Sequence, residues 1–124
     1  MKIKRSLVSV VDDDESIRES LPDLLRELGY AAHTFSSAEE FLESDYLHRT
    51  DCLILDIAMP GMTGPELQSE LTIRQQRIPI IFITAKRDEA LRPRLLKLGA
   101  AECLLKPFSE ADLLGALDAV FQKN

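Results

Sequence analysis

The side chains best suited to chemistry stand where apolar segments of the sequence end. Asp12 and Asp13 follow LVSVV, Asp56 follows CLIL, Thr84 follows IIFI and Lys106 follows CLL. Carboxylates that meet in one cleft raise one another's pKa, and a hard divalent cation such as Mg²⁺ relieves that repulsion. Carboxylate, hydroxyl, ammonium and Mg²⁺ are together the groups that neutralise a phosphoryl group in transfer. The pattern therefore indicates phosphoryl chemistry, with a carboxylate as the nucleophile.

Apolar segments rich in β-branched residues predict five strands, and the segments of helical period between them predict five helices. The predicted strands cover residues 7–11, 31–35, 51–56, 79–83 and 101–105. The predicted helices cover about 17–28, 37–42, 65–73, 88–98 and 109–121. Two prolines fall inside helical segments: Pro22 predicts a kink or a place in the first turn, and Pro93 opposes a continuous helix over 88–98.

Short polar motifs mark three helix starts. Ser37 and Glu40, like Thr63 and Glu66, have the spacing of a capping box, and Ser109 is the expected N-cap of the last helix.

The order βαβαβαβαβα predicts the α/β class, with a parallel sheet covered by helices on both faces. Right-handed crossovers make a doubly wound sheet the simplest arrangement. In such sheets the site lies at the carboxyl ends of the strands. We therefore expect the four polar strand ends to meet there.

Length and composition restrict the remaining classes. The 124 residues suit one domain, 1–124, and the net charge of −6 argues against direct nucleic-acid binding. The longest apolar stretch, IPIIFITA, is too short to cross a membrane, and acids interrupt the apolar part of the leading MKIKRSLVSVVDDD before it resembles a secretion signal. Two cysteines make no disulfide framework, so we expect free thiols and a cytoplasmic location.

The motifs VVDDD, LILDIAMPGMTG, FITA and LLKPF, in this order and spacing, resemble the receiver domain of bacterial response regulators, the CheY-like family. The stretches SIRESL, SSAEEFL and MPGMTGPEL are similar to receivers of the FixJ type. The resemblance covers essentially the whole chain. It implies a five-stranded sheet with strand order 2-1-3-4-5, and a two-component phosphorelay in which a sensor histidine kinase is the partner.

The resemblance also implies a metal site. Asp13, Asp56 and the backbone carbonyl of Ala58 would bind Mg²⁺ directly, and Asp12 would act through a water molecule on the metal.

Further roles are implied around the phosphoryl group. Asp56 would accept it from a phosphohistidine, Thr84 would hydrogen-bond one of its oxygens, and Lys106 would pair with another. The Lys106–Pro107 peptide corresponds to a family position with a cis bond.

Three positions depart from the family pattern or tune it. Cys103 stands three residues before the lysine, where the family usually has a Tyr or Phe that moves inward with the threonine, so the threonine–aromatic form of the switch is in doubt. Ala58, two residues after Asp56, offers no side chain to the site. Lys86, two residues after Thr84, offers a cation, and we expect it to influence the lifetime of the phosphorylated state.

The same residues oppose two competing functions. A haloacid-dehalogenase-like phosphatase needs a second Asp where Ala58 stands, and a flavodoxin-like flavin carrier would find its phosphate repelled by DDDES after the first strand. We therefore expect no enzyme beyond self-phosphorylation and autodephosphorylation on Asp56. The remaining alternative is a receiver-like interaction module regulated without phosphorylation, which only Cys103 supports.

The family resemblance implies a homodimer through the fourth helix, fifth strand and fifth helix. Whether an effector domain, such as a DNA-binding one, follows in a longer protein is left open by the sequence.

Overall fold

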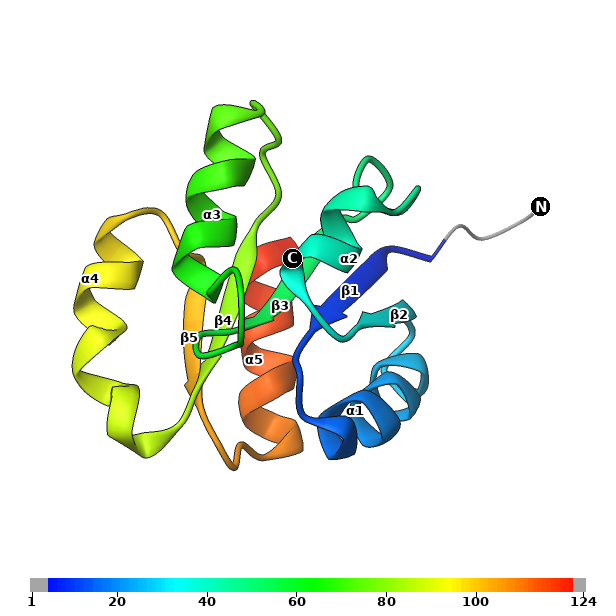
Figure 1. Cartoon of the computed structure of the whole chain (residues 1–124). Coiled ribbons are helices and arrows are strands. Elements are labelled where there is room, and N and C mark those ends of the chain that lie inside the picture. Colours follow the sequence, from blue (N-terminus) through cyan, green and yellow to red (C-terminus); the bar gives the residue numbers. More distant parts are fainter. Residues whose placement is uncertain (1–4, 122–124) are drawn as a thin grey trace.

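A computed structural model describes residues 5–121, which form one parallel sheet with helices on both faces (Figure 1). The strands are β1 (Leu7–Val11), β2 (Ala31–Phe35), β3 (Cys52–Asp56), β4 (Ile80–Thr84) and β5 (Glu102–Leu105), in the order β2-β1-β3-β4-β5. The predicted α/β class and strand order are therefore confirmed. The predicted single domain 1–124 includes residues 1–4 and 122–124, which lie outside the described residues. The start of the leading segment MKIKRSLVSVVDDD lies outside them as well.

The helices are α1 (Glu15–Glu27), α2 (Ala38–Glu43), α3 (Gly64–Ile73), the short 3₁₀ helix η1 (Lys86–Leu91), α4 (Arg92–Lys97) and α5 (Glu110–Phe121). None of the helices within residues 5–121 is long and apolar enough to cross a bilayer.

The sheet separates two apolar cores because successive side chains of a strand point to opposite faces. In β3, Leu53 and Leu55 face the core covered by α2, α3 and α4, whereas Cys52 and Ile54 face the core covered by α1 and α5. All five residues of β3, and all five of β4, are buried. Central strands without polar alternation are what a doubly covered parallel sheet requires.

Side-chain caps fix where several helices begin. Thr63 Oγ1 accepts from the Glu66 amide and the Glu66 carboxylate accepts from the Thr63 amide, which completes the predicted capping box of α3. Ser109 Oγ likewise accepts from the Asp112 amide at the start of α5, at 3.0 Å. Ser37 caps α2, but the Glu40 carboxylate accepts from the amide of Ser36 rather than that of Ser37.

The predicted helix over 88–98 is wrong in its extent. The segment forms η1, which begins at Lys86, followed by the six-residue α4, which ends at Lys97. Pro93 lies in the first turn of α4, where its missing N–H has no intrahelical partner to lose. A proline at this point separates the 3₁₀ turns from the α-helix. Pro22, in contrast, lies inside α1 as an interior residue.

Candidate functional site

Strand register brings the polar strand ends together. Val11 of β1 lies opposite Leu55 of β3, so Asp12 and Asp56 follow at adjacent positions along this edge of the sheet. Thr84 is the last residue of β4 and lies opposite Leu105 of β5. The amide of Lys106 donates to the Thr84 carbonyl at 2.7 Å, which fixes the lysine beside the end of β4.

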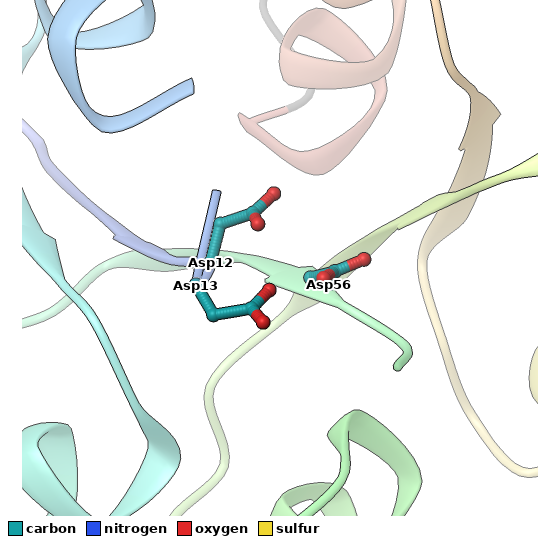
Figure 2. A group of neighbouring side chains, drawn as sticks. All are labelled: Asp12, Asp13 and Asp56. Carbon is teal, nitrogen blue, oxygen red and sulfur yellow. The ribbon is translucent and has the colours of Figure 1, made fainter. Parts of the chain in front are cut away.

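Three carboxylates form one cluster at this edge. Asp12, Asp13 and Asp56 each offer an oxygen, and these oxygens lie within 4.8 Å of one another (Figure 2). Asp12 is fully buried and Asp56 is 6% exposed, whereas Asp13 is exposed to solvent. The cluster therefore has two desolvated acids and one acid that borders water.

Lys106 supplies a cation to the cluster. Its Nζ lies 3.0 Å from Asp12 Oδ2 and 3.4 Å from Asp56 Oδ1, and its side chain is 23% exposed. Burial disfavours the ammonium, but the nearby carboxylates of Asp12 and Asp56 outweigh it and raise the lysine pKa. One ammonium thus faces three carboxylates, so the cluster keeps an excess of negative charge.

That excess is evident in the ionisation of Asp56. Burial, with the charge of Asp12 adding to it and Lys106 opposing, raises the pKa of Asp56 from 3.8 to about 7. A carboxylate with this pKa is ionised at neutral pH only at a cost to the folded state. Another cation near Asp56 would reverse the effect.

The donor set fits a hard divalent cation. Three carboxylate oxygens, two from the residues just after β1 and one from the last residue of β3, converge without any histidine or cysteine among them. Mg²⁺ prefers oxygen ligands and is commonly held by one or two carboxylates while it retains water. The cluster could therefore bind such an ion.

The other predicted site residues lie at or just after the carboxyl ends of β3, β4 and β5. Thr84 is 2% exposed at the end of β4, and Lys86 is exposed at the start of η1. Ala58 lies exposed in the loop between β3 and α3. The Lys106–Pro107 peptide is cis, as the family resemblance implied.

Cys103 is a core residue of β5 and not part of the acidic cluster. It is 6% exposed, lies opposite Phe82 of β4, and packs in the core covered by α2, α3 and α4. Both cysteines are free and buried, and Cys52 belongs to the core on the opposite face. Burial raises the pKa of both thiols.

Sequence reasoning missed two contacts near the site. Arg18 of α1 donates from Nη1 to the Asp12 carbonyl at 2.9 Å, and Glu39 of α2 accepts from the Met62 amide at 3.0 Å. Both contacts join a side chain to a backbone group, and because every residue has such a group, no sequence motif indicates them. Asp14 is the N-cap of α1 and accepts from the Ser16 amide at 2.9 Å.

Comparison with known proteins agrees with this geometry. The family model described as "Response regulator receiver domain" matches residues 8–118. Nodulation protein W of Bradyrhizobium diazoefficiens is 41% identical over 97% of this chain and 53% of its own length. Transcriptional regulatory protein FixJ of Azorhizobium caulinodans is 39% identical over 90% of this chain and 53% of its own. The chain thus spans about half the length of these curated relatives.

Solved structures of response regulators have the same fold. The response regulator StyR superposes with a TM-score of 0.86 at 47% identity, over 96% of this chain and 60% of that chain. The structure described as FixJ-N superposes with a TM-score of 0.84 at 31% identity, over 98% of each chain. The family model covers residues from all five strands and the acidic cluster. Together with these similarities, the match shows that the chain belongs to the family of response regulator receiver domains of two-component systems.

Proposed function

We propose that the chain receives a phosphoryl group on Asp56 from a phosphohistidine of a sensor kinase, in a Mg²⁺-dependent reaction. The observation that carries the proposal is the meeting of Asp56 with Asp12, Asp13 and Lys106 at one edge of the sheet. Family membership supports the same assignment. We propose no activity on a separate substrate beyond self-phosphorylation and autodephosphorylation.

Asp56 is the proposed nucleophile. A carboxylate oxygen attacks phosphorus, the P–N bond of the phosphohistidine breaks, and its electron pair stays on the ring nitrogen. The histidine leaves as neutral imidazole because its other ring nitrogen carries a proton. The new P–O bond makes an acyl phosphate. Because a protonated carboxyl is a poor nucleophile, the raised pKa of Asp56 predicts that a neighbouring cation is needed for full reactivity at neutral pH.

Asp13, Asp56 and the Ala58 carbonyl would hold Mg²⁺, with Asp12 contributing through water. When bound, the ion neutralises the carboxylates and the oxygens of the incoming phosphoryl group. Asp12 has a second task that the contacts support: its buried Oδ2 lies 3.0 Å from Lys106 Nζ and so fixes the ammonium beside Asp56.

Thr84 and Lys106 are the proposed phosphoryl-binding side chains. Lys106 Nζ lies 3.4 Å from Asp56 Oδ1, close enough to pair with an oxygen of a group attached to that carboxylate. Thr84 is the last residue of β4, the strand next to β3, so its hydroxyl lies at the same edge of the sheet as Asp56. Lys86, exposed two residues later, is proposed to affect how long the phosphorylated state lasts.

A homodimer is the proposed consequence of phosphorylation. The α4, β5 and α5 region leaves apolar side chains in solvent: Leu98 of the α4 end is 60% exposed, Leu105 39% and Leu114 37%. Apolar exposure of this kind favours association with a second copy. Light scattering with and without a phosphoryl mimic tests the proposal, and identical masses would count against it.

The receiver-like module without phosphorylation remains the second candidate, because the buried Cys103 occupies the usual aromatic position. The two candidates differ in one chemical property. Incubation with radiolabelled acetyl phosphate and Mg²⁺ should label the chain, and hydroxylamine should release the label because it cleaves acyl phosphates. A chain that takes no label, or keeps it in hydroxylamine, would support the module that is not phosphorylated on a carboxylate. A cytoplasmic location stays a prediction.

A further inference from the structure

The loop between β3 and α3, residues 57–63, is fixed at its base. The Gly64 amide donates to the Ile57 carbonyl at 2.9 Å. A Cβ at Gly64 would collide with the carbonyl oxygen of Asp56, so a glycine is needed for this close approach. The loop therefore starts and ends against the backbone of the proposed phosphoryl acceptor.

The tip of the same loop is held by a different element. Met62 donates its amide to Glu39 Oε2 at 3.0 Å, across 23 positions of sequence. Gly61 has φ +72, and a Cβ placed there would lie 2.7 Å from the same oxygen. Among residues 5–121, Glu39 is the one side chain outside the two flanking elements, β3 and α3, whose hydrogen bond to this loop is observed.

The segment that carries Glu39 also contacts the loop that begins with Asp12. The start of α2 is fixed by Ser37, which accepts from the Glu40 amide at 3.0 Å, and by Glu40, which accepts from the Ser36 amide at 3.0 Å. Just before it, the Phe35 carbonyl accepts from the Asp12 amide at 3.1 Å. One short segment, 35–40, thus contacts both the loop that begins with Asp12 and the loop that follows Asp56.

We propose that Glu39 is a positioning residue for the acidic site: its carboxylate holds the β3–α3 loop, and with it the backbone of Ala58, in the conformation that binds Mg²⁺. The proposal rests on the proposed function. Glu39 does not touch the reacting atoms; it is exposed and acts through the Met62 amide. Pre-organised support of this kind makes a metal site tighter because less loop entropy is lost on binding.

Three variants test the role. Glu39→Ala removes the acceptor, Glu39→Gln keeps an acceptor oxygen, and Glu43→Ala is the control because Glu43 is an exposed acid of the same helix. We expect Glu39→Ala to weaken Mg²⁺ binding by about tenfold, the size of effect seen for groups that orient metal ligands. Glu39→Gln should recover most of the affinity, and Glu43→Ala should match wild type.

The measurements are a MgCl₂ titration followed by amide NMR shifts, and hydrogen exchange of the Met62 amide without metal. Faster Met62 exchange together with weaker Mg²⁺ binding in Glu39→Ala alone supports the proposal. Faster exchange with unchanged Mg²⁺ affinity would overturn it, since the loop would then be held without serving the site. Equal losses in Glu39→Ala and Glu43→Ala would also overturn it, because removing any acid of α2 would suffice. A wild-type chain that binds no Mg²⁺ would instead contradict the proposed function itself.

Discussion

Replacing Asp56 with asparagine should stabilise the folded chain at alkaline pH when no divalent cation is present. The folded state raises the pKa of Asp56 from 3.8 to about 7, mainly through burial. Between these values the folded chain binds a proton that the unfolded chain has released, so stability falls as pH rises through this window. The slope is about 1.4 kcal/mol per pH unit, which gives a cost of about 4 kcal/mol once Asp56 is ionised.

Asparagine removes that cost but also removes one partner of Lys106, which keeps Asp12 at 3.0 Å. We therefore expect Asp56→Asn to gain about 2–4 kcal/mol at pH 8 in EDTA and less than about 1 kcal/mol at pH 4.5. Urea unfolding at both pH values measures the difference, which is large against the total stability of a domain of this size. Saturating MgCl₂ at pH 8 should stabilise wild type and reduce the gain of the variant.

Asp118→Asn is the matched control, because Asp118 is an exposed acid of α5 far along the chain from the cluster. It should change stability by less than about 0.5 kcal/mol at either pH. The electrostatic reasoning is refuted if Asp56→Asn destabilises the chain at pH 8 in EDTA, or if its effect is the same at pH 4.5 and pH 8.

Three further substitutions probe other residues of the proposed site. Lys106→Met should destabilise the chain by about 2 kcal/mol in urea at pH 8, because it leaves the buried Asp12 without a cation; unchanged stability would contradict the ion pair. Thr84→Ala should slow phosphoryl uptake from acetyl phosphate by about tenfold, the value of one hydrogen bond to a charged group, as followed by mass spectrometry over time; an unaltered rate would remove Thr84 from the site. Lys86→Ala should shorten the lifetime of the phosphorylated chain by about threefold, as expected for an exposed charge, and an unchanged rate of dephosphorylation would exclude its role.

Much of the fold follows from the sequence because its signals are local and strong. The apolar segment ending at Asp56 and the one ending at Thr84 are buried throughout, so no polar alternation obscures them. Capping at Thr63 was visible as a motif and is observed. The predicted extent of the fourth helix was wrong because a proline is compatible with the first turn of a helix but interrupts the interior of one. The sequence does not show which of these positions Pro93 occupies, whereas the folded structure places it in the first turn of α4.

The convergence of the acidic side chains could also be predicted, since parallel strands present their carboxyl ends at one edge. What the sequence could not give is the support around them. Arg18 bonds the Asp12 carbonyl and Glu39 the Met62 amide, and in both contacts one partner is a backbone group common to every residue. Such contacts depend on how α1 and α2 pack against the sheet.

Asp56 is proposed to accept a phosphoryl group with the help of a divalent cation. The most direct test is the intact mass of the chain after incubation with acetyl phosphate, for wild type and Asp56→Asn, each in MgCl₂ and in EDTA. We expect wild type in MgCl₂ to gain the mass of one phosphoryl group, and the other three samples to stay unmodified. A mass gain in Asp56→Asn equal to that of wild type, or no gain in wild type with Mg²⁺, would contradict the claim.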